Sequence, residues 1–232
     1  MKKTLLAMTV ASTIALMPVM AHAVDLDSED QKVSYSLGLI LGEKLKQDMD
    51  TLDLEAFQAG LKSIYEGATP ELDAQQVGET MQAFQAKKME EQRKLVADLA
   101  QKNLEAGEAF LAENAKRDGV VTTDSGLQFE EVVAGTGKQP SAEDTVKVHY
   151  RGTLIDGTEF DSSYSRNEPV SFPLNGVIPG WTEALQMMKE GGKAKLAIPS
   201  DLAYGPGGMG NAIGPNSTLV FDVELLEVNP SE

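Results

Sequence analysis

Apolar residues recur at helical spacing in the first half of this 232-residue chain and at alternating spacing in the second half. Between Val33 and Leu45 they lie three or four positions apart, as on one face of a helix. The preceding Ser28-Glu-Asp-Gln31 has the pattern of a capping box, which begins a helix by pairing its first free N–H groups. A second, short helix is expected from the cap residue Asp53 to a stop near Gly67.

The longest predicted helix begins after the cap residue Asp73 and runs to about Asn114 without a proline. At 1.5 Å per residue, some forty residues span roughly 60 Å, which is longer than a small domain is wide. From Lys87 to Lys94 this helix is almost wholly charged or polar. Helices of that kind usually bridge domains through solvent, so we expect a connecting helix over residues 73–114, with its start packed in the domain before it.

The two short helices and the start of the long one are too small to bury a hydrophobic core comfortably. Self-association is the simplest remedy, so we expect residues 24–72 to form an all-α dimerisation domain. Gly38 and Gly42 lie one helical turn apart and would let another backbone come close. Packing within the domain and packing across a dimer explain these glycines equally well.

After Gly119 the apolar positions alternate, which predicts strands with one buried and one solvated face. Turn signals separate these segments, including Asp156-Gly157. One short amphipathic helix is expected from Trp181 to a stop at Gly191-Gly192. The predicted fold class is α+β: a C-terminal antiparallel β-sheet wrapped on one short helix, preceded by the helical domain and the connecting helix. The alternating segments are 127–129, 146–150, 194–198 and 219–225.

The first residues have the three parts of a secretory signal peptide: the basic Met1-Lys-Lys3, the apolar Thr4 to Met20, and the small-x-small Ala21-His-Ala23. A membrane anchor is the alternative reading. The apolar stretch is short for a membrane span and is interrupted by polar residues and Pro18. We therefore expect residues 1–23 to be a signal peptide that is cleaved after Ala23.

Composition excludes several kinds of chemistry. Cleavage would remove two lysines and change the formal net charge from −16 to −18, and so acidic a surface argues against nucleic acid as a partner. The chain has no cysteine, which excludes thiol catalysis, a lipid-modified cysteine and Cys-ligated zinc. His149 would be the only histidine of the mature chain, and it falls on the strand face opposite Val148 and Tyr150. We expect no catalytic histidine, no metal site and no cofactor.

Aromatic residues are only 6% of the chain, yet they concentrate in the second half. Such a cluster is what a small apolar pocket needs, although aromatic side chains more often simply fill a core. The glycine-rich Gly205 to Gly210 segment lacks the Lys-Ser/Thr of a phosphate-binding loop and is not expected to open a helix. The rings are those of Tyr150, Phe160, Phe172, Trp181, Tyr204 and Phe221.

Several separated blocks of this second half closely resemble the FKBP-type peptidyl-prolyl cis-trans isomerases, or rotamases. The resemblance covers about residues 119–229 almost without gaps, and residues 119–232 are therefore expected to be an isomerase domain. The signal peptide, helical domain and long helix are further similar to the Mip-type subgroup of Gram-negative bacteria, whose members are homodimers joined at their N-terminal domains. The blocks are Val148-His-Tyr-Arg-Gly-Thr-Leu154, Gly157 to Ser163, Val177-Ile-Pro-Gly-Trp181, Ala203-Tyr-Gly205 and Leu219 to Leu225.

The resemblance implies a substrate pocket with Trp181 as its floor. Asp161 and the Tyr204 hydroxyl would form its polar edge, and the Ile178 amide would bond a substrate carbonyl. Val170 stands where some members carry an aromatic residue, and Ile213-Gly-Pro215 replaces the commoner Ile-Pro-Pro, so the rim is expected to differ. The implied catalytic residues are Tyr150, Asp161, Trp181, Tyr204 and Phe221, and the substrate-binding residues add Phe160, Val177, Ile178 and Ile213.

The implied function is isomerisation of Xaa-Pro bonds in unfolded or exported polypeptides, in the periplasm or in association with the outer membrane or cell surface. Rapamycin-like macrolides would be expected as inhibitors. The alternative is a holdase chaperone or peptide-binding module with weak catalysis, in which the helical domain is the functional part. A surface factor that contacts host tissue is a third reading that rests on the family analogy alone.

Overall fold

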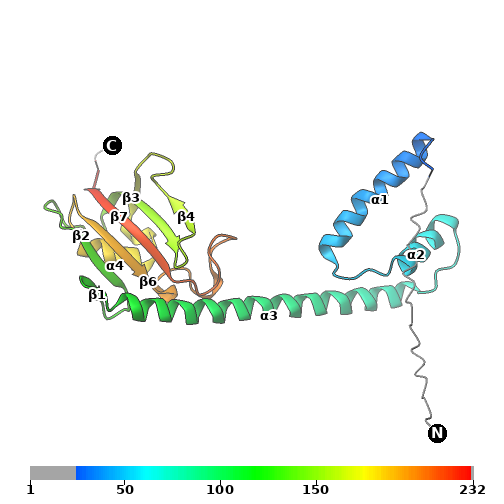
Figure 1. The fold of residues 1–232 in the computed structure, drawn as a ribbon, viewed down its shortest axis with the longest axis horizontal. Coiled ribbons are helices and arrows are strands. Elements are labelled where there is room, and N and C mark those ends of the chain that lie inside the picture. The colour runs from blue at the N-terminus through cyan, green and yellow to red at the C-terminus, as the bar shows by residue number, and fades with distance from the viewer. Residues whose placement is uncertain (1–24, 231–232) are drawn as a thin grey trace, which may run out of the picture. The chain divides into compact units, whose positions relative to one another are not determined.

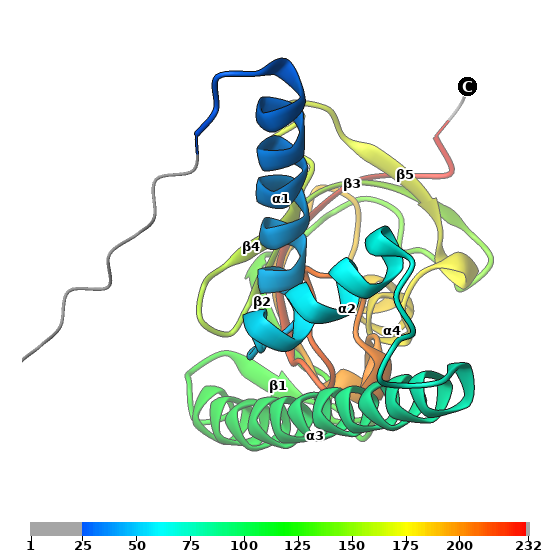
Figure 2. The ribbon, with the colours of Figure 1, turned by 90° about the vertical axis from the view of Figure 1, so that its right-hand side faces the viewer.

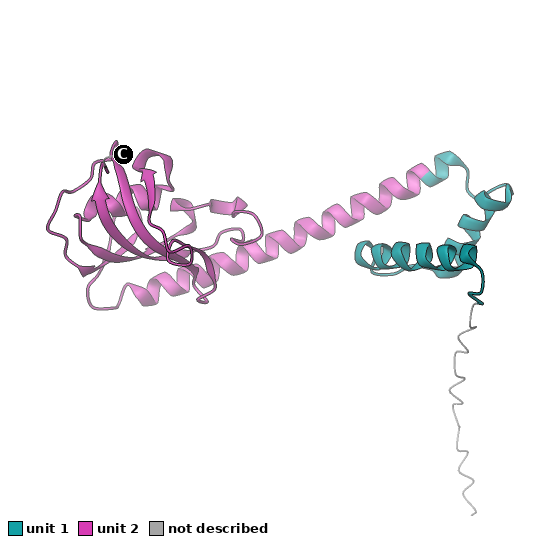
Figure 3. Ribbon diagram, turned by 90° about the horizontal axis from the view of Figure 1, so that it is seen from above, with its two compact units in different colours: residues 1–77 teal, residues 78–232 magenta. Residues whose placement is uncertain are grey.

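The computed structural model describes residues 25–230, so the predicted signal peptide and its cleavage site lie outside the described residues. The chain divides into two compact units between Val77 and Gly78 (Figure 3). The helical segments before this point form the first unit. The second contains most of the long helix together with the sheet.

The first unit contains α1 (Glu29–Asp48), α2 (Leu54–Glu66) and the first residues of α3 (Figure 1). The predicted capping box is present, since Ser28 Oγ accepts from the Gln31 N–H at 3.1 Å and Gln31 Oε1 accepts from the Ser28 N–H at 2.8 Å. Asp53 caps α2, and Gly67 ends it in the left-handed conformation at φ 70°. In this chain taken by itself, no residue of α1 or α2 is buried.

Helix α3 runs from Ala74 to Asn114, the range that the sequence predicts. Asp73 caps it, with Asp73 Oδ1 accepting from the Gln76 N–H at 2.8 Å and the Gln76 side chain accepting from the Asp73 N–H at 3.0 Å. Charged side chains on its surface pair across one turn, such as Lys87 with Glu91. These exposed pairs each contribute little to stability.

The sheet is antiparallel throughout, with strand order β1-β2-β6-β7-β3-β4 and β5 paired with β3 (Figures 1 and 2). The two ten-residue strands β3 and β7 form its centre, and Gly152 of β3 lies opposite Phe221 of β7. The strands are β1 (Val120–Thr122), β2 (Gln128–Val133), β3 (Thr145–Leu154), β4 (Glu159–Ser162), β5 (Val170–Pro173), β6 (Lys193–Ile198) and β7 (Leu219–Val228).

Helix α4 (Pro179–Met187) lies against one face of this sheet and supplies Trp181, Ala184 and Leu185 to the core (Figure 1). The prediction that it continues to Gly191-Gly192 is wrong. The helix ends at Met187, because Met188 is already extended and Lys189–Gly192 form a turn whose Gly191 N–H donates to Leu225 O at 2.8 Å. That bond ties the turn to β7 instead of extending the helix.

The sequence also missed short elements. Strands β1, β4 and β5 have three or four residues each, which is too short for an alternating pattern to be recognised. The Gly205 segment does open a short 3-10 helix (Gly205–Gly207), and two others cover Leu174–Gly176 and Ser200–Leu202. Over the described residues, no helix has the length and apolar character that crossing a membrane requires.

The start of β3 is tied to the end of β7 through Asp144. Its carboxylate accepts from the Ser141 N–H at 2.8 Å and from Asn229 Nδ2 at 2.6 Å. The Ser141 backbone, the Asn229 side chain and the Ser141 hydroxyl hold the pKa of Asp144 at about 2, below its ordinary value of 3.8. Since the folded pKa lies below the unfolded one, the ionised group stabilises the fold above pH 3.8, and this contribution is lost as the pH falls toward about 2.

We therefore expect Asp144→Asn to lower the free energy of unfolding at neutral pH and to differ less from the wild type as the solution is acidified from about pH 4 toward pH 2. Urea unfolding at a series of pH values measures this. Asp118→Asn, at an exposed carboxylate, is the matched control. A difference between Asp144→Asn and the wild type that stays constant down to pH 2 would contradict the assignment.

Candidate active site

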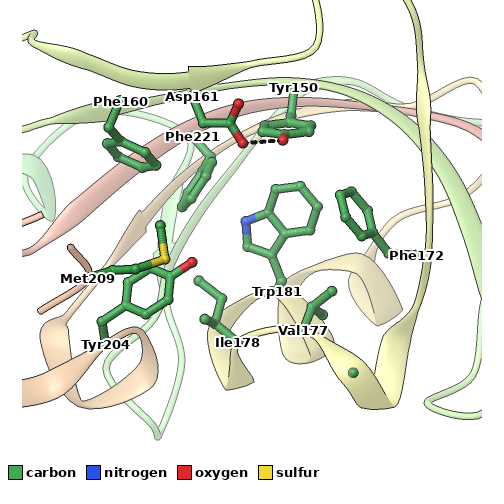
Figure 4. Close-up of a pocket in the computed structure, with 11 residues that line it drawn as sticks. Tyr150, Phe160, Asp161, Phe172, Val177, Ile178, Trp181, Tyr204, Met209 and Phe221 are labelled. Carbon is green, nitrogen blue, oxygen red and sulfur yellow. Dashed lines mark hydrogen bonds between the residues drawn. The ribbon is translucent and has the colours of Figure 1, made fainter. Parts of the chain in front are cut away.

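A cavity of about 460 Å³ opens between the sheet and α4 (Figure 4). Rings from four strands and from α4 make up most of its wall, so its lining is mainly apolar. A carboxylate and two phenolic hydroxyls are the exceptions. The lining residues are Tyr150, Phe160, Asp161, Phe172, Gly176, Val177, Ile178, Trp181, Tyr204, Met209 and Phe221.

Trp181 forms the floor of this cavity and is only 4% exposed. It lies in the first turn of α4, where Pro179 has the fixed φ that suits a helix start. Gly180 lets this turn approach the sheet, because a Cβ there would lie 2.5 Å from a methyl carbon of Ile198. The indole Nε1 has no hydrogen-bond partner among the described residues, and it faces the ring of Phe221 (Figure 4).

The rings around Trp181 meet it edge to face. The centroid distances are 5.2 Å to Tyr150, 5.2 Å to Phe221 and 5.7 Å to Phe172, with interplanar angles of 86°, 78° and 89°. This arrangement suits aromatic quadrupoles better than face-to-face stacking. Because the rings stand upright around the indole, they form walls around it and leave an open cavity above.

One side of the cavity is polar. The Tyr150 hydroxyl donates a short hydrogen bond to Asp161 (Figure 4). Arg166 Nη1 donates to the other carboxylate oxygen at 2.6 Å. Arg166 Nη2 also donates to the Tyr150 hydroxyl at 3.1 Å. The antiparallel pairing of β3 with β4 brings Tyr150 and Asp161 together. Arg166 follows β4 in the chain, is half-exposed, and donates to both members of this pair.

This network fixes the ionisation of the polar groups. Burial acts to raise the pKa of Asp161, but the hydrogen bonds from Tyr150 and Arg166 outweigh it, so that the pKa lies below its ordinary value. Burial raises the pKa of Tyr150, and the bond to Asp161 adds to this effect. Burial and the charge of Asp161 also raise the pKa of Tyr204. At neutral pH the cavity therefore holds one fixed carboxylate and two neutral phenols.

The loop between β6 and β7 covers the remaining side of the cavity. Tyr204 points its hydroxyl inward, and the Met209 side chain lies beside it (Figure 4). Met209 and Ile213 pair through two backbone hydrogen bonds of 2.8 and 3.1 Å. The thioether of Met209 is a flexible apolar group, suited to contact with side chains of varying shape.

The predicted site residues can now be placed. Those predicted from the sequence line the cavity together, with one exception: Ile213 is only 1% exposed, belongs to the core and does not line it. Its bridge partner Met209 takes the position on the loop side. Met209, Gly176 and Arg166 also belong to the site and were not predicted from the sequence. Alternation would not have found them, because Met209 and Arg166 lie in loops and turns and Gly176 lies in a short 3-10 helix.

The rim also differs from expectation at β5. Val170, which stands where some members of the family carry an aromatic residue, is half-buried in the core and does not line the cavity. Phe172, two residues further on the same strand face, supplies the ring there, 6.0 Å from Tyr150. Phe172 was recognised as part of the aromatic cluster but not as a lining residue.

His149 lies outside the cavity, as the alternation predicts. Its Nδ1 is 2.9 Å from Ser163 Oγ, and its ring stacks on Tyr164 at a centroid distance of 4.7 Å. Over residues 25–230, no cluster of three or more His, Asp or Glu side chains is placed to hold a metal ion. The lining is thus suited to binding and orienting an apolar group, while each oxygen of its carboxylate already accepts a hydrogen bond.

Comparison with known proteins agrees with this geometry. Residues 136–226 match the family model of the FKBP-type peptidyl-prolyl cis-trans isomerase, and residues 30–130 match the domain amino terminal to that isomerase. The chain is 48% identical over 209 residues to a probable isomerase, FkpA, of Neisseria meningitidis, covering 87% of this chain and 75% of the relative. It is 40% identical over 206 residues to the outer membrane protein MIP of Legionella longbeachae, covering 89% and 88%. The crystal structure of FkpA from Escherichia coli matches with a TM-score of 0.78 at 43% identity, covering 90% of this chain and all of that one.

The absence of a side chain at Gly152 keeps the cavity open. A Cβ at this buried position would lie 2.6 Å from the Phe160 ring and 2.7 Å from the Phe221 ring. We expect Gly152→Ala to push both rings into the cavity, to lower the free energy of unfolding by about 1–3 kcal/mol and to change the emission of Trp181. Trp181 is the chain's only tryptophan, so fluorescence and urea unfolding measure both effects.

Gly207→Ala is the matched control, since nothing lies within 4 Å of a Cβ at this position. It should leave both the emission and the stability close to those of the wild type. If Gly152→Ala did the same, the rings would not depend on that space.

Proposed function

The chain belongs to the FKBP-type peptidyl-prolyl cis-trans isomerases, and we propose that it acts in the cavity above Trp181, where the ring of a substrate proline lies on the indole. The observation that carries this proposal is the upright arrangement of the rings around Trp181. They leave a flat apolar surface, enclosed on its sides and open at the top. A prolyl ring is apolar and compact and fits such a surface.

The reaction suits these residues, because no covalent bond is broken. An Xaa-Pro bond isomerises over tens to hundreds of seconds, since twisting it sacrifices amide resonance across a barrier of about 18–20 kcal/mol. The twisted amide has less charge separation than the planar one. An apolar cavity that excludes water therefore favours the twisted form relative to the planar form. Lowering the barrier by about 5–7 kcal/mol would accelerate the reaction by roughly four to five decades.

The polar edge has the proposed role of orientation. Asp161 remains ionised and is held by Tyr150 and Arg166, so that it presents a fixed charge to the carbonyl carbon side of the twisting amide. Tyr204 stays protonated and offers an O–H donor from the loop side. The N–H of Ile178 is at the N-cap of α4, where it has no partner within the helix, and it would donate to a substrate carbonyl. None of these roles transfers a proton.

The isomerase assigned to this family acts on proline-containing polypeptides, and we propose unfolded, exported proteins as the clients. The alternative function, a holdase chaperone with weak catalysis, would place the main activity in the helical unit. The aromatic cavity favours the isomerase, because a holdase needs no enclosed site for a single ring. A rapamycin-like macrolide would compete with the peptide for the same cavity.

The isomerase proposal is tested by the rate of cis-trans exchange in a short Xaa-Pro peptide. Phe221→Ala removes one wall, and we expect it to lower kcat/KM by roughly tenfold to a hundredfold, equivalent to about 1.4–2.8 kcal/mol. Tyr204→Phe removes only the loop hydroxyl and should cost a smaller factor. Tyr164→Phe, at an exposed tyrosine outside the cavity, is the matched control and should have no effect.

Full activity in a folded Phe221→Ala protein would refute the cavity assignment. A wild-type protein that did not accelerate exchange, yet still suppressed aggregation of an unfolded client, would support the holdase instead.

We also propose the domain organisation and the location of the protein. Residues 24–72 would form a dimerisation domain, 73–114 a connecting helix and 119–232 the isomerase domain, in a homodimer exported after cleavage at Ala23. The exposed apolar side chains of α1 and α2 support the dimer, since Ile40 is 68% and Ile64 72% exposed in the single chain. An apolar surface of this kind marks an interaction site. The relatives named FkpA and outer membrane protein MIP support export to the periplasm, with or without association with the outer membrane.

Mass measurements on protein recovered from the periplasmic fraction test both the proposed cleavage and the proposed dimer. We expect a mature chain that begins at Val24 and a native mass of twice that chain at micromolar concentration. Ile40→Glu should give monomers, because it would place a charge in the apolar interface. Leu95→Glu, at a residue 63% exposed on α3 outside the first unit, is the matched control and should stay dimeric. A monomeric wild type would remove the dimer proposal.

A further inference from the structure

The C-terminal part of α3 is hydrogen-bonded to the loop that covers the cavity. Asn103 Nδ2 donates to Pro215 O at 2.8 Å, across 112 positions of sequence. In the opposite direction, Asn216 Nδ2 donates to Ala100 O at 3.4 Å. Helix and loop both belong to the second unit and run side by side (Figure 1). The helix and the loop therefore each donate one side-chain amide hydrogen bond to the backbone of the other.

Close packing accompanies these bonds. Gly107 is the only buried residue of α3, every residue of which is described, and a Cβ there would overlap Thr218 Oγ1. Ala100, Asn103 and Gly107 lie three and four positions apart, so they share one face of the helix. At these three positions this face carries small or amide residues. It is shaped to let a loop backbone come close and to bond with it.

The bonded segment is connected directly to the cavity lining. The Asn216 N–H donates to Gly205 O at 2.9 Å, and Gly205 follows Tyr204 in the chain. Between them, Met209 is placed by its backbone pairing with Ile213. The α3 contacts thus fix the end of the loop, and the end of the loop fixes the segment that carries Tyr204.

The loop needs such an anchor because of its composition. It carries five glycines between residues 205 and 214, and glycine loses more conformational freedom on ordering than any other residue. The side-chain amide of Asn103 lies against Gly214, because a Cβ there would lie 3.0 Å from Asn103 Nδ2. Gly214 thus adds conformational freedom to the loop backbone and also leaves room for the Asn103 side chain, which restrains the loop.

We propose that Asn103 is a positioning residue of the isomerase, which acts through the loop and does not touch the substrate. Its amide ties the glycine-rich loop to a rigid helix, so that Tyr204 and Met209 are in place before the substrate binds. The inference rests on the function proposed for the cavity. Without the amide, the loop would have to be ordered at each binding event, which weakens binding without changing the chemical step.

Two variants of the full-length protein test this. Asn103→Ala removes the side chain, and Asn103→Asp keeps its shape but replaces the donor with an acceptor facing Pro215 O. We expect either change to speed amide hydrogen exchange in residues 203–216 by roughly three- to tenfold, while exchange in β3 and β7 stays unchanged. On a chromogenic Ala-Leu-Pro-Phe peptide, KM should rise by roughly the same factor with kcat nearly constant.

Asn114→Ala is the matched control. Asn114 also links α3 to the sheet, through a 2.8 Å bond to Gln128 Oε1, but it lies away from the loop. It should change neither loop exchange nor KM. Loop exchange equal to that of the wild type in both Asn103 variants would overturn the proposal, as would a kcat loss with KM unchanged.

The same loop effect in Asn114→Ala would also overturn it, by showing that α3 only stabilises the domain as a whole. The exchange measurement needs no substrate, so it decides whether Asn103 anchors the loop even if the wild type proved inactive. Inactivity of the wild type would instead count against the proposed function of the cavity.

Discussion

The edge-to-face contact of Trp181 with rings from three strands is the interaction on which the site depends. Tyr150 comes from β3, Phe172 from β5 and Phe221 from β7, so the contact also joins α4 to the sheet where the cavity lies. Stacked rings would have filled this space as ordinary core. The near-perpendicular rings surround the indole without stacking on it, and together with it they line a cavity. One aromatic cluster thus stabilises the domain and forms the site.

The two units hold themselves together in different ways. The sheet unit has a core of aliphatic side chains such as Leu196, Leu219 and Leu225, each fully buried. The helices α1 and α2 have well-formed caps but no buried residue in the single chain. Caps contribute about 1 kcal/mol each and do not stabilise a domain alone. The first unit therefore has local structure that its sequence specifies, and an apolar surface that remains exposed in the single chain.

The features that could be predicted from the sequence are the periodic and the local ones. Ten-residue strands such as β7 show clear alternation, and Ser28 and Asp53 cap helices within three residues of themselves. The strand β4 has four residues and no readable period, although it carries Asp161. The place of Met209 depends on a loop pairing, and the contact of Asn103 with Pro215 joins segments more than a hundred positions apart. Neither leaves a pattern along the chain, so they appear only once the chain is folded.

Electrostatics explains why the carboxylate on the polar side of the cavity stays ionised, as its proposed role requires. Burial beside an apolar cavity acts to raise the pKa of a carboxylate, because it disfavours the charged form. Here Tyr150 and Arg166 supply hydrogen bonds that more than offset this cost and direct both oxygens of Asp161. The charge is thus fixed in place before any substrate arrives, and it requires no reorganisation as the amide twists. In the mechanism we propose, a reaction that only redistributes charge within one amide needs a fixed charge beside an apolar floor, for which Asp161 and Trp181 are the proposed groups.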